Sequence, residues 1–219
     1  MPRIGIVSGL LEEAESFRPG VGKARRKSPY YCREDDGGWV VGCAGIGKVN
    51  AAMVATEMVD AGCKILISMG VAGRIGKATD RVYWVDRAYQ HDYGRYGAEG
   101  MTAYRAGSLP FGKTSLDPFV AIDDPGLDLP RATILTGDCF LEDPDHGGKL
   151  AGQFDAELID METAAIAQVA AMHRVGWASV RAVSDDANAA GEDDFRANLV
   201  RAAARAGDEV DRLVDLLLT

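Results

Sequence analysis

The stretch WVVGCAGIGKVNAAMVATEMVDAGCKILISM, residues 39–69, contains a strand, a helix and a second strand in that order, and this order decides the fold class. Apolar runs at Trp39–Cys43 and Ile65–Met69 have the composition of buried strands. Between them, apolar residues recur on one face of a predicted helix from about Ile46 to Ala61, and Gly62 suits the position after its end. Two buried strands joined by a helix are typical of a parallel sheet.

The same alternation continues on both sides of this unit. Residues 161–174 predict a helix with small and apolar residues almost all round, which favours a deep position. A last helix begins at Asp193 or Asp194 and carries an apolar stripe from Phe195 to Leu217. We therefore predict an α/β fold: a single three-layer domain over residues 1–219, in which helices flank a mostly parallel mixed sheet. Further strands are predicted at Ile4–Ser8, Val82–Ala88, Ala132–Thr136 and Trp177–Val183, with Tyr30–Arg33 forming a hairpin with Trp39–Cys43.

The composition is that of an ordinary globular protein, with 47% hydrophobic and 26% charged residues among 219. The 33 acidic residues exceed the 24 basic ones, and the net charge of -9 disfavours nucleic acid or an anionic membrane as a partner. No stretch approaches the ~18 consecutive apolar residues of a membrane span, and the start MPRIGIVSG has no leader pattern, so we expect a cytoplasmic protein. The cysteines lack CxxC and metal-site spacing, and we expect Cys32, Cys43, Cys63 and Cys139 to be reduced and structural.

Residues 92–130 differ from the rest of the chain, because they are rich in Gly, Pro, Tyr and Asp and show little periodicity. A segment of this length is too long for a simple turn. We expect a functional or interface role for it.

Small and acidic residues follow the predicted strands, at the edge where an open α/β sheet usually binds its ligand. Small residues let the backbone approach a ligand closely, and carboxylates suit a polar neutral or cationic ligand better than a nucleotide. The segment GCAGIGK lacks the spacing of a dinucleotide-binding motif and of a P-loop, so a tight turn before a helix is the simpler interpretation. The segments concerned are Ser8–Gly9, Gly42–Gly47, Gly70–Gly73, Thr136–Phe140, Asp160–Thr163 and Ser184–Asp186.

Three carboxylates stand out at these strand ends, and each also has a purely structural interpretation. Glu13 opens the first helix, where an acidic side chain favours the positive end of the helix dipole. Glu162 begins an apolar helix and needs a partner, which is either a pair of ligand hydroxyls or a helix N-terminus or Arg181. Asp185 follows a central strand and either faces the ligand or, like Asp186 beside it, caps a helix or forms an Asx-turn.

Carboxylates from three separate strand ends favour acid/base chemistry on a substrate that carries hydroxyls. The sequence has no GxSxG elbow for a nucleophilic serine and no clustered metal ligands, since His91, His146 and His173 lie apart at loop or helix-end positions. We expect neither a metal nor an organic cofactor, because carboxylate acid/base catalysis and binding can carry such a reaction.

Six motifs match one family in sequence order. IGIVSGLLEEAE, residues 4–15, is similar to that family's opening IGIIGAMEEE. The motifs AGIGKVNAA, SMGVAG, LTGDCFL, DMETAAIAQV and VRAVSDDA follow, and residues 93–129 match only weakly. Together they resemble the bacterial 5′-methylthioadenosine/S-adenosylhomocysteine nucleosidases of the nucleoside phosphorylase superfamily. The resemblance implies a nucleoside phosphorylase-like fold.

The resemblance also implies a reaction, the hydrolysis of the bond between adenine and a 5′-substituted ribose through an oxocarbenium-like transition state. Glu13 would activate the attacking water, and Asp185 would protonate or hydrogen-bond N7 of the departing purine. Glu162 would hold the ribose hydroxyls, and Arg181 would help to place the water and the acids. These roles predict different environments for the two catalytic carboxyls, with a pKa raised by burial for Asp185 and an ionised Glu13.

The other residues of the implied substrate site are apolar or small. By the same resemblance, Phe140 would stack on the purine, the backbone of Leu141 would read its edge, and Met161 would lie against the sugar. Ile46 and Phe195 would border the 5′ substituent. The predicted substrate site is completed by the strand-end residues Val71, Ala72, Gly73 and Ser184.

The family commonly forms dimers that share residues across the interface, so the resemblance implies a homodimer. Met101, Tyr104 and Pro110 lie in the weakly matched segment and would contribute to the partner's pocket.

Two positions depart from the family pattern. Val71 stands where the nucleosidases usually carry Ser in GSAG, which removes a hydroxyl near the sugar and the water. Arg74 lies beside the Gly70–Gly73 turn and is either an anion ligand or an exposed surface residue. A phosphate site would indicate a purine nucleoside phosphorylase, but the turn GIGK lacks the Arg expected there, and this favours hydrolysis.

Two further alternatives stay open at this stage. A nucleosidase for a specialised substrate, such as futalosine or an adenosyl-hopanoid intermediate, would fit the changed turn at Val71. A non-catalytic nucleoside-binding protein would keep the pocket without turnover.

Overall fold

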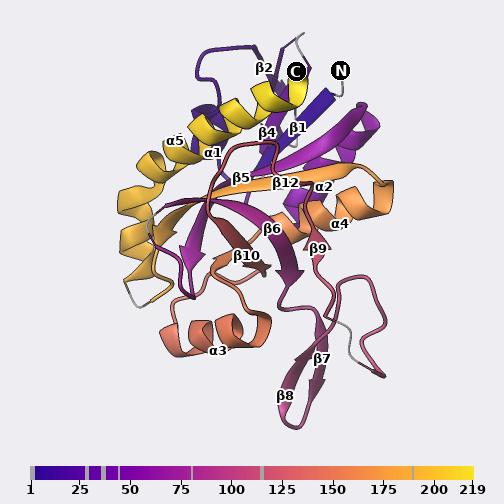
Figure 1. Ribbon diagram of the computed structural model, residues 1–219, viewed down its shortest axis with the longest axis vertical. Coiled ribbons are helices and arrows are strands. Elements are labelled where there is room, and N and C mark those ends of the chain that lie inside the picture. Colours follow the sequence, from indigo (N-terminus) through magenta and orange to yellow (C-terminus); the bar gives the residue numbers. More distant parts are fainter. Residues whose placement is uncertain are drawn as a thin grey trace.

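The computed structural model describes residues 3–27, 30–35, 38–43, 45–79, 81–113, 116–188 and 190–219, with the backbone alone for residues 25–27, so Ala44 of the segment GCAGIG lies outside the described residues. Helices cover both faces of a central sheet, as Figure 1 shows. The helices are α1 (Leu11–Ser16), α2 (Lys48–Asp60), α3 (Pro144–Phe154), α4 (Thr163–His173) and α5 (Gly191–Leu218). The strands are β1 (Arg3–Ser8), β2 (Lys23–Lys27), β3 (Tyr30–Glu34), β4 (Trp39–Cys43), β5 (Cys63–Arg74), β6 (Val82–Gln90), β7 (Gly94–Gly97), β8 (Gly100–Ala103), β9 (Phe119–Val120), β10 (Arg131–Thr136), β11 (Leu158–Asp160) and β12 (Gly176–Asp185).

The main sheet is mixed and has the strand order β11-β10-β6-β12-β5-β1-β4-β3-β2. Parallel pairing joins β4, β1, β5 and β12, so these four strands end at the same edge of the sheet. Strands β6, β10 and β11 are also parallel to one another, but β6 is antiparallel to β12. Strand β11 also pairs with the end of β5, so strands β5, β12, β6, β10 and β11 form a closed ring. Asp160, the last residue of β11, therefore lies close to the end of β5.

Two helix layers bury the two faces of this sheet. Helices α2 and α4 pack on one face, against Val7 and Leu66 among others. Helices α1 and α5 pack on the other face, against Ile6 and Met69 among others. Neighbours in β1 thus point to opposite layers, as the two-residue period of a strand requires. The predicted three-layer α/β fold with a mixed sheet is confirmed.

The predicted elements agree with the structure except at several ends. Strand β4 has the predicted bounds, and β3 pairs antiparallel with it, as expected of the hairpin. The prediction of a turn at Gly70–Gly73 is wrong, because β5 continues to Arg74 and pairs with β12 as far as Gly73. Helices α2 and α4 each begin two residues later than predicted, at Lys48 and Thr163, whereas α5 begins earlier, at Gly191. Six elements were not predicted from the sequence: β2, β7, β8, β9, β11 and α3.

The segment 92–130 contains a hairpin, formed by β7 and β8, and the short strand β9, which pairs with β6. Figure 1 shows the hairpin projecting from the sheet together with the loop that follows it. Within the described ranges, no helix is long and apolar enough to cross a membrane.

Candidate active site

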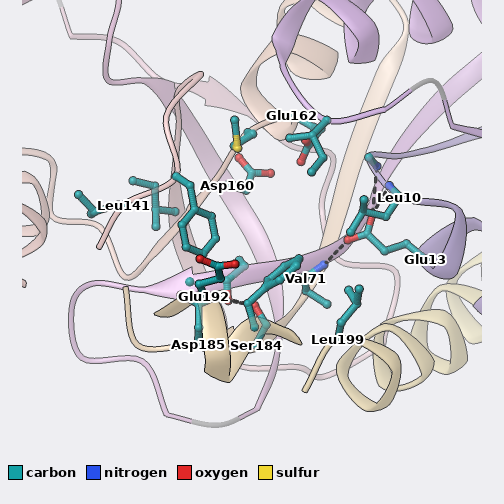
Figure 2. Close-up of a pocket in the computed structure, with 18 of the residues that line it drawn as sticks. Leu10, Glu13, Val71, Leu141, Asp160, Glu162, Ser184, Asp185, Glu192 and Leu199 are labelled. Carbon is teal, nitrogen blue, oxygen red and sulfur yellow. Dashed lines mark hydrogen bonds between the residues drawn. The ribbon is translucent and has the colours of Figure 1, made fainter. Parts of the chain in front are cut away.

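A cavity of about 760 Å³ opens at the edge of the sheet where β1, β5, β11 and β12 end. Its lining includes Glu13, Glu162 and Asp185, the three carboxylates that the sequence analysis singled out. Figure 2 shows Glu13 and Glu162 on one side of the cavity and Asp185 on another, beside Ser184 and Glu192. The predicted substrate-site residues that also line it are Ile46, Val71, Ala72, Gly73, Phe140, Leu141, Met161, Ser184 and Phe195.

Glu13 reaches the cavity from α1 and is almost fully buried, with 3% of its surface exposed. One carboxylate oxygen accepts hydrogen bonds from the backbone N–H groups of Gly9 and Leu10, both at 3.0 Å. The other accepts from the backbone N–H of Val71 at 2.9 Å. Burial raises the pKa of Glu13, while Arg181 and the three backbone donors oppose this rise. All three partners can only donate, and this geometry suits the ionised carboxylate.

Glu162 lies at the N-cap position of α4 and is 5% exposed. Its Oε1 accepts from the backbone N–H of Gly47 at 3.1 Å, and its Oε2 lies 3.8 Å from the Arg181 guanidinium. Burial and the neighbouring Asp160 carboxylate raise the pKa of Glu162 to about 8. Both structural partners considered from the sequence, a helix N-terminus and Arg181, are therefore present. The carboxylate also lines the cavity, where it can accept hydrogen bonds from a ligand.

Asp185, the last residue of β12, has partners of a different kind. Its Oδ2 accepts from the Ser184 hydroxyl at 2.7 Å, and its Oδ1 accepts from the backbone N–H of Ala187 at 3.0 Å, which is an Asx-turn. Burial raises the pKa of Asp185, and Asp186 and Asp194 add to the rise. The Ser184 hydroxyl also lies 3.3 Å from the Ala72 carbonyl oxygen. It can therefore donate to Ala72 and accept from Asp185 when that carboxyl carries a proton.

The predicted contrast between the two carboxyls is found in their partners, not in the direction of their pKa shifts. Burial raises the pKa of Glu13 as well as that of Asp185, which the sequence analysis did not expect of Glu13. The hydrogen-bond partners of Glu13 can only donate, whereas the Ser184 hydroxyl beside Asp185 can either donate or accept a hydrogen bond.

A glycine lies against each of the three carboxylates. A methyl group on Gly70 would come within 2.3 Å of Glu13 Oε1, and one on Gly9 within 2.9 Å of Glu162 Oε1. One on Gly73 would come within 2.9 Å of Asp185 Oδ1. Each carboxylate therefore occupies space that any other residue type would fill with its Cβ.

Arg181 is fully buried beneath the cavity and does not line it. Its guanidinium lies 2.7 Å from Asp160, donates to Ser68 and Thr163, and donates to the Val71 carbonyl oxygen at 3.2 Å. Asp160 in turn accepts from the Thr136 hydroxyl and from the backbone N–H of Thr163. Arg181 was predicted from the sequence, but this supporting network was not. The signal for Arg181 in the sequence was a charged residue among the aliphatic residues of β12.

The aromatic part of the site lies at the mouth of the cavity. The rings of Phe140 and Phe195 meet edge to face with centroids 5.8 Å apart. Phe140 is 47% exposed, so about half of its surface is open to solvent or to a ligand. Cys139 next to it is exposed and lines the cavity, which makes the expected structural role wrong for this cysteine. Cys32, Cys43 and Cys63 lie in strands β3, β4 and β5, as that role predicts.

The two cations near the glycine-rich segments are held by aspartates. Arg74 forms a two-point ion pair with Asp186, with one contact at 2.9 Å, and does not line the cavity. Lys48 contacts both carboxylate oxygens of Asp92, at 2.6 and 2.7 Å. Of the two interpretations of Arg74, the surface residue fits the structure better, except that the Arg74 guanidinium is paired with Asp186.

Met101, Tyr104 and Pro110 do not line the cavity of their own chain. Met101 is half-buried in β8 and Pro110 is half-buried in the loop after it. Tyr104 is 3% exposed, and its hydroxyl donates to the Gly112 carbonyl oxygen at 3.2 Å. Because its side chain is buried in its own chain, the structure does not favour Tyr104 as a contributor to a partner's pocket.

Among the described residues, no group of three or more His, Cys, Asp and Glu side chains could hold a metal ion.

The fold and the site together define a class: an α/β protein with three buried carboxylates at the edge of the sheet where ligands bind. Comparison with known proteins names the family. The family model of the phosphorylase superfamily matches residues 3–215, and the chain belongs to this superfamily. It is 27% identical to the 5′-methylthioadenosine/S-adenosylhomocysteine nucleosidase of Mycobacterium bovis, over 98% of this chain and 97% of that protein. The resemblance found in the sequence is thus confirmed.

Two solved structures from Helicobacter pylori show the same fold. One is a 5′-methylthioadenosine/S-adenosylhomocysteine nucleosidase with butyl-thio-DADMe-Immucillin-A, with a TM-score of 0.84 at 22% identity over 98% of both chains. The other is a futalosine hydrolase mutant, with a TM-score of 0.83 at 22% identity over 98% of this chain and 99% of that one.

Proposed function

We propose that the protein hydrolyses the N-glycosidic bond of a 5′-substituted adenosine of the methylthioadenosine or S-adenosylhomocysteine type and releases adenine. The observation that carries the proposal is the convergence of Glu13, Glu162 and Asp185 on one cavity. The relative from Mycobacterium bovis bears the name of this activity and spans almost the whole chain, which supports the same assignment.

The proposed step is a displacement by water at C1′ of the ribose. Glu13 accepts a proton from the water as its oxygen bonds to C1′. The bond from C1′ to N9 breaks, its electron pair moves into the purine, and Asp185 gives its proton to N7. The products are adenine and the free 5-substituted ribose. The raised pKa of Asp185 supports its role as the acid, and the three N–H donors around Glu13 support its role as the base.

The charges of the cavity support water rather than phosphate as the nucleophile. Among its described lining residues, Arg196 is the one cation, and its guanidinium pairs with Glu192 at 2.8 Å. The lining also includes seven acidic side chains: Glu12, Glu13, Glu142, Asp160, Glu162, Asp185 and Glu192. An acidic cavity repels phosphate, and Arg74 and Lys48 are already held by aspartates. A phosphorylase would need a free basic group here.

The remaining predicted roles are part of this proposal. Glu162 holds the ribose hydroxyls, Phe140 stacks on the purine, and the backbone of Leu141 reads the purine edge. Met161 packs against the sugar, and Ile46 and Phe195 border the 5′ substituent. Arg181 lies beneath the cavity and helps to place the water and the acids through its contacts with Asp160 and the backbone of Val71.

We also propose a homodimer, because the cavity opens to solvent beside half-exposed apolar residues. Ile46 is 45% exposed at its mouth. Met101 and Pro110 remain the candidates for a contribution from the partner. A sedimentation measurement that gives a monomer at micromolar concentration would contradict this part of the proposal.

The test is base release from methylthioadenosine, followed by chromatography with and without phosphate. We expect adenine and free methylthioribose at rates that do not depend on phosphate. A phosphate requirement with a ribose 1-phosphate product would replace the proposal with a phosphorylase. Parallel reactions with S-adenosylhomocysteine, adenosine, inosine and futalosine define the 5′ substituent. Release from futalosine alone would assign a specialised nucleosidase, and binding of methylthioadenosine without any release would assign a nucleoside-binding protein.

A further inference from the structure

A cluster of three charged residues lies outside the cavity, at the N-terminus of α2. Lys48 is the first residue of α2, Asp92 follows β6, and Asp138 follows β10. The ammonium group of Lys48 contacts the Asp92 oxygens at 2.6 and 2.7 Å and lies 3.6 Å from Asp138 Oδ2. We call Lys48, Asp92 and Asp138 the ion cluster. None of the three lines the cavity.

The ion cluster supplies a cap that α2 does not have in its own sequence. The N-cap residue of α2 is Gly47, which has no side chain to accept a hydrogen bond. Asp138 Oδ1 accepts from the backbone N–H of Lys48 at 2.8 Å, and Glu162 Oε1 accepts from that of Gly47 at 3.1 Å. Two carboxylates from distant segments thus take the place of a local cap at the positive end of the helix dipole.

The same cluster fastens the loop that carries Phe140. The Asp138 backbone N–H donates to Asp92 Oδ2 at 3.0 Å, so Asp138 is bound through its main chain and through its carboxylate. Two residues further on, Phe140 is 47% exposed, and Phe195 is the aromatic ring that it contacts. Burial opposes ionisation of Asp92, but the hydrogen bonds from Lys48 and Asp138 outweigh it and lower the pKa of Asp92.

We propose that Lys48 is a positioning residue, whose ammonium group fixes the loop of Phe140 and the Gly47 donor of Glu162 relative to each other. The inference rests on the proposed function, because it assigns Phe140 to the purine and Glu162 to the ribose. Lys48 touches neither the substrate nor the reacting atoms. Its charge neutralises the two aspartates. Without it their mutual repulsion would push the loop of Asp138 away from Asp92, and α2 would lose its side-chain link to Asp92.

The test replaces Lys48 by Met, which keeps the length of the side chain and removes its charge. Loss of a charge-assisted contact predicts a KM about tenfold higher and adenine binding weaker by the same factor, with kcat little changed. The amide hydrogens of Lys48 and Asp138 should exchange faster in the ligand-free protein. Lys48→Arg should restore all three readouts, and Lys149→Met, at an exposed position in α3, is the matched control.

Unchanged adenine affinity in a folded Lys48→Met variant overturns the proposal, even where exchange is faster, because the cluster would then be structural only. An equal effect in Lys149→Met overturns it too. If Lys48→Met does not fold, Lys48→Gln, which keeps a polar end group and removes the charge, carries the same expectations. If the unaltered protein neither binds adenine nor releases it, the proposed function fails, and unchanged exchange at Asp138 separately overturns the role of the cluster.

Discussion

The two sides of the cavity differ in how they hold their residues. The inner wall, Gly9, Glu13, Val71 and Glu162, is built from strand ends and helix starts, and its carboxylates are at most 5% exposed. The outer rim, Phe140, Glu142, Glu192 and Arg196, lies on a loop and the first turns of α5 and is exposed. Three backbone N–H groups hold the Glu13 carboxylate on the inner wall. On the rim, Glu142 accepts one backbone N–H bond, from Glu192, and Glu192 pairs with Arg196. The residues proposed for the chemistry therefore lie on a buried wall, and some of those proposed for recognition lie on an exposed rim.

The largest effect is expected at the inner wall. Glu13→Gln keeps the shape of the side chain but removes the base, so turnover should fall on the order of 100-fold or more. Steady-state base release measures it. Glu15→Gln, exposed in the same helix, is the matched control. Near-normal turnover in Glu13→Gln would remove Glu13 from the mechanism.

A similar loss, again on the order of 100-fold, is expected for Asp185→Asn, because the amide cannot give a proton to N7. Asp186→Asn is the informative comparison, since Asp186 pairs with Arg74 and does not line the cavity. We expect that variant to keep most of its activity. The opposite order of the two variants would transfer the acid role to Asp186.

A smaller effect is expected from Gly70→Ala. The added methyl would lie 2.3 Å from Glu13 Oε1 and 2.5 Å from Arg181 Nη1, so both groups must move. Overpacking of this kind costs about 1–3 kcal/mol of unfolding free energy, and displacement of Glu13 should also lower kcat. Denaturant unfolding and turnover measure the two effects. Gly148→Ala, in α3 with open space around it, should leave both unchanged or slightly raise stability.

The smallest effect is expected on the pH dependence of the stability of the fold. Burial and Asp160 raise the pKa of Glu162 from 4.5 to about 8, so the folded chain binds this proton more tightly than the unfolded one. The resulting stabilisation is complete below the unfolded pKa and is lost as the pH rises through about 8. Melting temperatures of the ligand-free protein, measured between about pH 5 and pH 8.5, should fall with pH. Glu162→Gln should flatten this fall, and an identical slope in both proteins would contradict the assignment.

The sequence predicted the inner wall better than the rim, for a physical reason. Parallel strands bring their carboxyl ends to one edge, so Glu13 after β1 and Asp185 at the end of β12 could be placed together from local pattern. Glu162 was placed with them although β11, the strand before it, was not predicted and runs antiparallel to β5. The segment Gly70–Gly73 was mistaken for a turn, because pairing with β12 overrides the local preference of glycine. Lys48 and Asp138 are 90 positions apart, and no local pattern indicates that they meet. The same holds for Arg74 and Asp186, which are separated by 112 positions.

The most direct test of the separate roles of Glu13 as base and Asp185 as acid uses a leaving group that needs no proton. We would measure hydrolysis of the 4-nitrophenyl β-riboside of 5-methylthioribose by the unaltered protein, by Glu13→Gln and by Asp185→Asn. Because 4-nitrophenolate leaves as an anion, Asp185→Asn should recover most of its activity on this substrate while Glu13→Gln stays impaired. Equal impairment of both variants on this substrate and on methylthioadenosine would contradict the assignment of separate base and acid roles.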